Sequence, residues 1–193
     1  MVAIIPGLTG NGDEIYCKNV AQAAIDNNYN VCVINHWGAL KTVVTSPKLY
    51  CAGSSWDVKE AMEYLSETFS NMKFFGVGFS LGANILGKYQ AEEGLKSLLK
   101  AAVCINGPLD ILEASHNVEN MWKGIFSKFL AKSLKEKFLE HEDCHGMIEE
   151  AHYIDMQHEL SKCFTMKDVD HYVTSRVMGF KDGDDYYRSV GCA

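Results

Sequence analysis

Short, continuous apolar runs alternate with longer segments of helical periodicity through the first half of the chain. Runs that are apolar throughout are typical of strands buried on both faces. Because these strands alternate with helices, the pattern predicts a parallel sheet that helices cover on both sides. The expected strands cover residues 1–6, 31–34, 74–77 and 101–105, and the expected helices cover residues 13–27, 55–69 and 81–89.

The second half of the chain has a different pattern. From Leu109 to Ala193 no apolar run predicts a buried strand, and the segment is helical and polar with charge-rich turns. We therefore expect an α/β class protein with two parts. A partial core with about four strands covers residues 1–106, and a helical cap region covers residues 107–193. A loop is expected over residues 35–54.

The strand at 74–77 runs into the pentapeptide Gly78-Phe79-Ser80-Leu81-Gly82, and a helical pattern follows at once. A serine at the apex of a tight turn between a strand and a helix is typical of a nucleophile elbow. The flanking glycines fit a turn in which strand and helix come too close for a side chain. Ser80 is therefore the candidate catalytic nucleophile, and an ordinary glycine-rich turn is the alternative.

Attack by a serine hydroxyl on a carbonyl builds negative charge on oxygen, and backbone N–H groups must be in place to receive it. One donor follows the nucleophile in this arrangement, which makes it the N–H of Leu81. The other comes from a loop after an earlier strand, where Gly7-Leu8-Thr9 stands. The N–H of Leu8 is thus the second oxyanion candidate, and a plain glycine turn is the alternative.

The groups that would activate Ser80 are not evident. A base and an orienting acid are expected in the order serine, acid, histidine, but no further strands follow to carry them. Asp110, just past the fourth strand, is a weak candidate for the acid. Six histidines lie in the helical half, where each fits a surface or helix-cap role better than that of a base. They are His116, His141, His145, His152, His158 and His171.

Composition narrows the class of protein. The chain has 193 residues, of which 47% are hydrophobic and 22% charged, and this suits a globular domain with a sizeable core. A formal net charge of -7 argues against general nucleic-acid binding, and no apolar run approaches a membrane span. Seven cysteines without C-x-x-C pairing favour a reducing compartment. We expect an intracellular protein, cytoplasmic or peripherally associated with a membrane.

Two patterns in the sequence raise the possibility of other sites, one for zinc and one for a dinucleotide. Residues 141–145 spell H-E-x-x-H, which on a helix places two imidazoles on one face for zinc. Gly146 follows at once, and a third ligand such as Glu159 is only a guess. Glycine clusters at 7–12 and 76–82 lie between a strand and a helix, but neither matches the G-x-G-x-x-G of dinucleotide sites. We expect no metal and no cofactor.

Residues 121–139 predict a basic amphipathic helix. An apolar stripe is surrounded by five lysines against a single glutamate, Glu136. Such a helix either packs its stripe over the active site as a cap helix, which we favour, or lies on an anionic membrane surface. The stripe consists of Ile125, Phe126, Phe129, Leu130, Leu134 and Phe138.

Six short motifs follow one another across both halves of the chain. They are Pro6 to Gly10, Asn35-His36-Trp37-Gly38, Leu49 to Ala52, Trp56-Asp57, the elbow at Ser80, and Gly179-Phe180-Lys181 with Asp185-Tyr186-Tyr187. In these motifs the chain resembles the abhydrolase-1/abhydrolase-3 and YheT-like branch of the α/β-hydrolases. The resemblance covers nearly the whole chain and implies an α/β-hydrolase-like fold.

The resemblance also implies an activity. It points to a serine hydrolase that cleaves carboxylic esters, including lipid and medium-chain acyl esters, through an acyl-enzyme on Ser80. It makes Asp57 a structural anchor, although an aspartate in the first turn of a helix is equally favoured by the helix dipole. A catalytically inactive module that binds a lipid or a protein partner is the alternative.

The chain departs from the family pattern in three places. Trp37 stands where the family usually has arginine, and the opening strands and membrane anchor of the family do not precede Met1. The family carries its catalytic aspartate and histidine on strands that would follow Ala193. The resemblance therefore implies a chain truncated at both ends, with its catalytic acid and base beyond residue 193.

Overall fold

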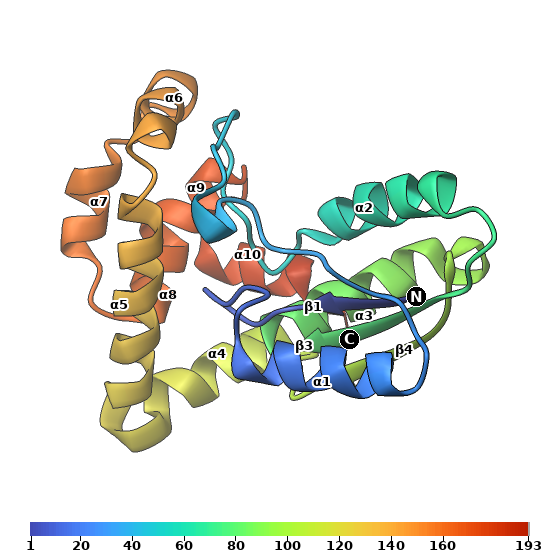
Figure 1. Cartoon of the computed structure of the whole chain (residues 1–193). Coiled ribbons are helices and arrows are strands. Elements are labelled where there is room, and N and C mark those ends of the chain that lie inside the picture. Colours follow the sequence, from blue (N-terminus) through green and yellow to red (C-terminus); the bar gives the residue numbers. More distant parts are fainter. Residues whose placement is uncertain (193) are drawn as a thin grey trace. The chain divides into compact units, whose positions relative to one another are not determined.

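The computed structural model describes residues 1–192, which form two compact units (Figure 1). The sheet unit consists of residues 1–39 and 52–109 with the C-terminal residues from Gly191. The helical unit consists of residues 40–51 and 110–190. These units are defined only by which residues lie close together, and this does not test the functional division of the chain. The division into a core over 1–106 and a cap over 107–193 therefore stays a prediction.

The sheet unit contains a four-stranded parallel sheet in the order β2-β1-β3-β4. Val2 pairs with Val31 on one side and with Phe75 on the other, and Phe75 pairs in turn with Ala101. The predicted parallel α/β architecture is therefore confirmed. Its elements are β1 (Val2–Ile5), α1 (Ile15–Asp26), β2 (Val31–Val33), η1 (Ala39–Lys41), α2 (Ser55–Thr68), β3 (Phe74–Phe79), α3 (Leu81–Glu93), η2 (Gly94–Lys96) and β4 (Leu99–Ile105).

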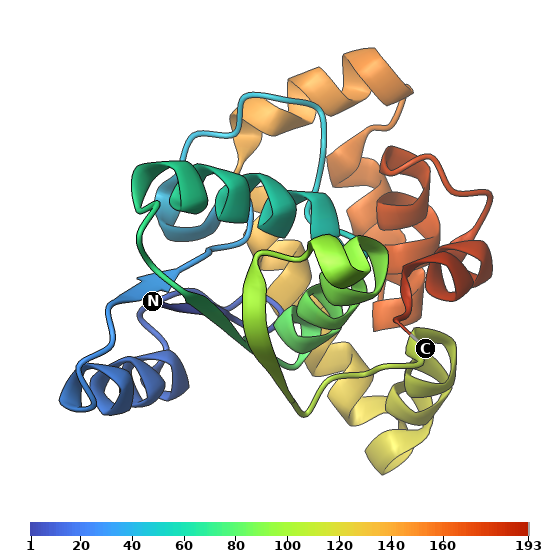
Figure 2. The same ribbon diagram turned by 90° about the vertical axis from the view of Figure 1, so that its right-hand side faces the viewer.

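Helices cover the two faces of this sheet, as Figures 1 and 2 show. Successive side chains of a strand point to opposite faces, so β1 contributes to two hydrophobic clusters. Ala3 and Ile5 belong to the cluster that α2 and α3 complete, with Met62 and Leu86 fully buried in it. Val2 and Ile4 belong to the cluster on the α1 side. The apolar run at the start of the chain is thus the centre of the core.

Strand β4 differs from this pattern. It lies at the edge of the sheet, and Ala101, Val103 and Cys104 are exposed on it, Val103 by 54%. The sequence predicts burial on both faces for every strand, and for β4 this is wrong. An edge strand has a neighbour on one side only, so an apolar run does not by itself reveal how much of it is covered.

The helical unit contains no strand within residues 110–190, as the sequence predicts. Its longest helix, α5, has 15 residues. No helix in the described part of the chain is long and apolar enough to cross a bilayer. The elements are α4 (Ile111–Asn120), η3 (Met121–Gly124), α5 (Ile125–Leu139), α6 (Glu142–His152), α7 (Met156–Lys162), α8 (Met166–Val169), the π-helical turn η4 (Asp170–Thr174), α9 (Ser175–Val177) and α10 (Gly183–Val190).

The segment 40–51 belongs to the helical unit although it lies far from it in sequence. The Tyr50 ring packs edge-on against Phe138 of α5, with 6.3 Å between ring centroids. His152 Nε2 lies 2.9 Å from the carbonyl oxygen of Pro47. The middle of the predicted loop is therefore held by side chains of α5 and α6.

Candidate active site

Ser80 occupies the turn between β3 and α3 with a strained backbone. Its φ of 51° and ψ of -118° lie outside the regions that residues other than glycine usually adopt. Such a conformation costs about 1–3 kcal/mol and persists only where the surroundings enforce it. Here the Ser80 N–H donates to the carbonyl of Ile105 at 2.9 Å, which ties the turn to β4. The side chain is exposed, so its hydroxyl is open to a reactant.

The two glycines of the pentapeptide allow the turn to close. A Cβ on Gly78 would lie 2.5 Å from the carbonyl oxygen of Gly82, and one on Gly82 would lie 2.2 Å from that of Pro6. Both contacts are with backbone atoms, which have little freedom to move away. The close approach of β3, α3 and the end of β1 therefore depends on the absence of side chains at these positions.

The loop after β1 lies beside Ser80. A Cβ on Gly7 would lie 3.2 Å from the Cβ of Ser80, so this backbone passes next to the candidate nucleophile. The Gly7 N–H donates to the Tyr16 hydroxyl at 3.2 Å, and the Gly10 N–H donates to the Gly7 carbonyl at 3.0 Å. The loop that carries Leu8 is thus fixed on both sides of that residue.

Two side chains hold this loop, and their roles were not predicted from the sequence. Tyr16 accepts from Gly7 and packs its ring 4.7 Å from that of Phe79, and burial raises the pKa of its hydroxyl. His36 lies 8% exposed with Nε2 at 2.9 Å from the Pro6 carbonyl, so this nitrogen carries the proton and donates. Burial lowers the pKa of His36, which favours the neutral imidazole.

The sequence contains both residues but does not indicate that they contact the loop after β1. His36 stands in the Asn35-His36-Trp37-Gly38 motif, yet nothing in the spelling shows that its imidazole reaches back to the loop after β1. Tyr16 is one aromatic residue near the start of a helix, where packing alone explains its presence.

The N–H groups of Leu8 and Leu81 form no hydrogen bond within residues 1–192. Leu81 is the first residue of α3, where orphan N–H groups and the helix dipole together favour an anion. Leu8 follows the residue whose backbone passes beside Ser80. Two donors without a hydrogen-bond partner thus lie on the segments next to the serine, and their role as an oxyanion hole stays a prediction.

A base for Ser80 is not found among the described residues. No hydrogen bond joins Ser80 Oγ to any side chain or backbone group of residues 1–192. Asp110 instead caps α4, accepting the Glu113 N–H at 2.9 Å. Asp57 lies in the first turn of α2, as either interpretation of it requires.

Four histidines of the helical unit lie at the start of a helix or contact a neighbouring carbonyl or ring. His141 is the residue before α6, and His145 Nε2 lies 2.8 Å from the Phe138 carbonyl. His152 contacts the Pro47 carbonyl, and the His171 ring packs edge-on against Tyr172. Within residues 1–192 no three histidine, cysteine, aspartate or glutamate side chains come close enough to hold a metal ion. The zinc interpretation of residues 141–145 therefore gains no support.

A strained serine between a parallel strand and a helix has a counterpart in known families. Residues 1–163 match the family model described as the alpha/beta hydrolase fold. The chain belongs to the α/β hydrolase family. The predicted resemblance and fold class are confirmed, and the family supports a hydrolase in coarse terms.

Relatives of the α/β hydrolase chain carry lipase and phospholipase names. A monoacylglycerol lipase of Saccharomyces cerevisiae is 28% identical over 98% of this chain and 43% of its own length. Phospholipase ABHD3 of Bos taurus is 25% identical over 96% of the chain and 44% of its own length. The embryogenesis-associated protein EMB8 of Picea glauca is 30% identical over 97% of the chain and 41% of its own length. The chain thus spans less than half of each of these relatives.

Proposed function

We propose that this α/β hydrolase chain carries the nucleophile of a serine hydrolase that cleaves carboxylic esters of lipids. The observation that carries the proposal is the strained backbone of Ser80, which presents an exposed hydroxyl beside the unpartnered N–H groups of Leu8 and Leu81. Strain of this size is kept where function needs it. The monoacylglycerol lipase and phospholipase names of the relatives support a lipid ester or a medium-chain acyl ester as the substrate.

The proposed reaction begins with a bond between Ser80 Oγ and the carbonyl carbon of the ester. The electron pair of the C=O bond moves to oxygen, and the N–H groups of Leu8 and Leu81 stabilise the resulting anion. The intermediate collapses by breaking the bond to the alcohol, which leaves the acyl group on Ser80 until water releases it. The proton of Ser80 must pass to a base and then to the leaving alcohol, and no residue of this chain is assigned to that step.

Tyr16 and His36 act in this proposal through the loop rather than on the substrate. Both contact the backbone at Pro6 and Gly7, immediately before Leu8. Losing one oxyanion donor typically lowers kcat by about 10²–10³-fold, so a loop displaced by a fraction of an ångström would be costly.

A lipid substrate also implies that the protein works at a membrane, and we propose peripheral contact with an intracellular membrane.

A fluorophosphonate probe tests the nucleophile directly, because it phosphonylates activated serines. We expect one adduct on Ser80 in the intact protein, located by tandem mass spectrometry, and none in Ser80→Ala. Ser70→Ala is the matched control, since Ser70 is an exposed serine of the same unit that lies outside the elbow, and it should be labelled like the wild type.

An intact, folded wild-type protein that is not labelled would contradict the proposal in favour of the inactive module. In that case the elbow geometry would serve only to pack α3 on the sheet, and the chain would bind a lipid or a protein partner without cleaving it. Hydrolysis of monoacylglycerols and of short-chain p-nitrophenyl esters then separates lipid substrates from small esters for a chain that is labelled.

A further inference from the structure

Helix α5 presents a mixed apolar and cationic face to solvent. Its buried side is formed by Ser127, Ala131, Leu134 and Phe138. On the opposite side Ile125 is 64% exposed and Phe129 is 62% exposed. The six-residue stripe is therefore divided, because its C-terminal members pack inward whereas Ile125 and Phe129 do not. Packing against protein explains only part of the stripe.

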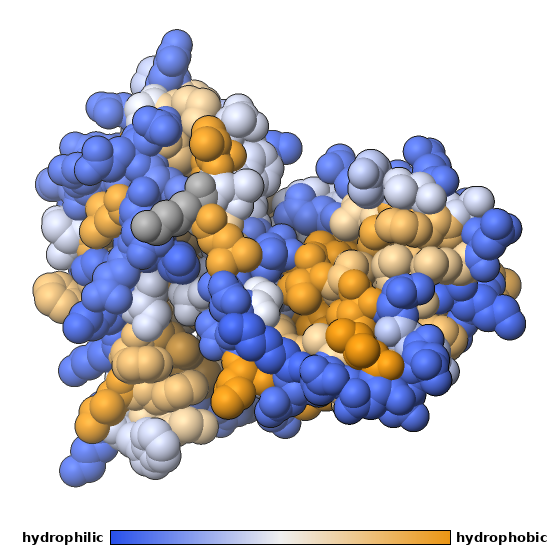
Figure 3. All heavy atoms as spheres, in the orientation of Figure 1, coloured by the Kyte–Doolittle hydropathy of each residue, from blue (hydrophilic) through white to orange (hydrophobic). Residues whose placement is uncertain are grey.

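Two further large side chains extend this exposed surface at the start of α5. Met121 is 43% exposed and Trp122 is 73% exposed, both on η3. We call Met121, Trp122, Ile125 and Phe129 the apolar corner. Figure 3 shows hydrophobic spheres bordered by hydrophilic ones at the lower left, where Figure 1 draws the start of α5. An exposed cluster of this kind marks an interaction site more often than a lone apolar residue does.

Lysines lie on the same face of the helix. Lys128, Lys132 and Lys135 follow one another at spacings of four and three residues, so they form one row beside Ile125 and Phe129. Between residues 121 and 139 there are five lysines and one glutamate, whereas the whole chain carries a formal net charge of -7. The segment 121–139 is therefore basic although the chain as a whole is acidic, and three of its lysines lie in this row.

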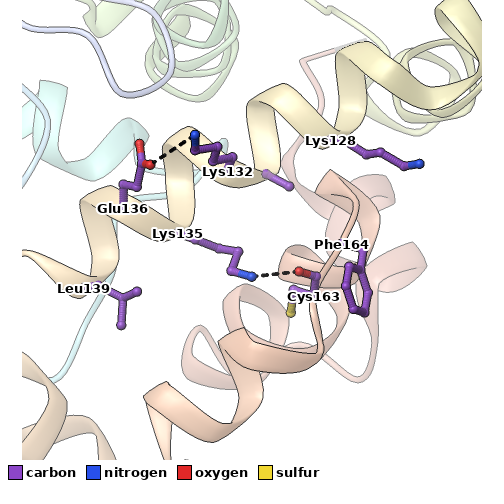
Figure 4. A pocket seen from close by; sticks show the side chains of 8 residues that line it. Lys128, Lys132, Lys135, Glu136, Leu139, Cys163 and Phe164 are labelled. Carbon is purple, nitrogen blue, oxygen red and sulfur yellow. Dashed lines mark hydrogen bonds and ion pairs between the residues drawn. The ribbon is translucent and has the colours of Figure 1, made fainter.

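A groove of about 340 Å³ runs between this row of lysines and the turn at Cys163–Phe164 (Figure 4). Lys135 Nζ donates to the Cys163 carbonyl at 2.9 Å, and Lys132 lies 3.8 Å from Glu136. Lys128 has no ion-pair or hydrogen-bond partner within residues 1–192. Phe164 lines the same groove and is 72% exposed. The groove thus combines a free ammonium group with an exposed aromatic ring.

We propose that the apolar corner and the lysine row of α5 dock the helical unit on a bilayer that contains anionic phospholipids. The corner enters the boundary between head groups and acyl chains, and Lys128 and Lys132 contact lipid phosphates. Tryptophan and phenylalanine beside lysines suit this boundary, because their rings sit in it while lysine stems reach back to the charged surface.

Other partners fit this surface less well. Lysine is depleted from protein–protein interfaces, whereas three lysines line this groove. Nucleic acid is disfavoured by the acidic net charge of the chain. The surface contains none of the residues around Ser80, so this inference stands independently of the proposed hydrolase activity.

Co-sedimentation with vesicles tests the proposal. We expect the chain to bind vesicles of equal parts phosphatidylcholine and phosphatidylserine, to bind pure phosphatidylcholine at least several-fold more weakly, and to lose binding in high salt. Ile125→Asp with Phe129→Asp should abolish binding, and Lys128→Glu with Lys132→Glu should weaken it roughly tenfold or more. Circular dichroism should show unchanged folding, because all four side chains are exposed.

The controls separate this surface from general stickiness and from the active site. Tyr64→Asp replaces an aromatic residue that is 67% exposed on α2, and it should bind like the wild type. Ser80→Ala should also bind like the wild type, so an inactive enzyme would not count against the docking surface. The proposal is overturned if mixed vesicles are not bound, or if Tyr64→Asp loses as much binding as the corner variant. A dimer that Phe129→Asp dissociates, with no vesicle binding, would equally overturn it in favour of an interface between copies.

Discussion

Both units bury hydrophobic side chains, but the sheet unit also depends on direct contacts between backbone segments. In the sheet unit backbone meets backbone, since Gly82 lies so close to the end of β1 that a Cβ would come within 2.2 Å of the Pro6 carbonyl oxygen. In the helical unit side chains from distant segments meet, as Tyr50 does with Phe138. The first kind of contact demands glycine at fixed positions, and the second tolerates many combinations of residues.

The two units also bury ionisable side chains of opposite type. The sheet unit buries a base, His36, which bonds to the backbone of the loop beside Ser80. The helical unit buries an acid, Asp170, which accepts a hydrogen bond from the Tyr187 hydroxyl at 2.8 Å. Because a buried charge is costly, each group favours its neutral form, and the two units should respond to pH in opposite directions.

The largest effect is expected from Gly82→Ala. The added methyl group would meet the carbonyls of Ile5 and Pro6, so α3 must separate from β1 or the turn at Ser80 must open. Overpacking usually costs about 1–3 kcal/mol and occasionally more, and backbone atoms that cannot move place this variant at the upper end of that range. We expect a lower midpoint of thermal unfolding and loss of fluorophosphonate labelling at Ser80.

Gly146→Ala is the matched control in the helical unit. Gly146 lies within α6, and apart from its chain neighbours and the adjacent helix backbone no described heavy atom lies within 4 Å of the position of an added Cβ. Alanine should therefore stabilise the helix by roughly 0.5–1 kcal/mol. If both variants destabilise the chain equally, the contrast between backbone contacts and side-chain contacts is wrong.

This contrast explains which features could be predicted from the sequence. The strands, the turn at Ser80 and the loop before Leu8 depend on local spelling, namely apolar runs and glycines at a sharp turn. The exposure of Val103 on β4 and the attachment of segment 40–51 to α5 and α6 depend on pairings between distant residues. Local patterns carry no information about such pairings.

The same limit applies to the candidate site. Ser80, Leu8 and Leu81 follow from one motif and one loop, and their catalytic roles stay predictions. Tyr16 and His36 contact the loop across 9 and 30 residues of sequence. Each of these contacts joins elements whose relative placement only the fold determines.

Asp170→Asn should have an effect that depends on pH and that reaches its full size only at basic pH. Burial raises the pKa of Asp170 to about 7, whereas an aspartate in an unfolded chain titrates near 3.9. The folded state therefore holds the proton more tightly, and the free energy of unfolding falls as pH rises from about 4 to about 7. Asparagine does not titrate, so the variant should lack this loss and be more stable than the wild type at pH 8, by roughly 4 kcal/mol at most.

Urea unfolding of the chain, monitored by hydrogen exchange of the α8 and α10 peptides, measures the stability of the helical unit. The measurement is made at acidic and at basic pH. Asp143→Asn is the control, since Asp143 is exposed in the first turn of α6, and it should leave the pH dependence unchanged. A stability difference between Asp170→Asn and the wild type that is the same at both pH values would show that the buried carboxyl does not titrate in this range.

His36→Gln should have the smallest effect, with the opposite sign. Burial lowers the pKa of His36, so the unfolded chain binds the proton more tightly than the folded one, and the free energy of unfolding falls as pH falls through the ordinary histidine range near 6.5. The slope for one proton is at most about 1.4 kcal/mol per pH unit. Glutamine keeps an N–H donor for the Pro6 carbonyl but does not titrate, so peptides of β1 should lose their protection at low pH in the wild type and keep it in the variant. If the protection of the α8 and α10 peptides changes together with that of the β1 peptides, the two units do not respond to pH separately. The predicted contrast between the units would then be wrong.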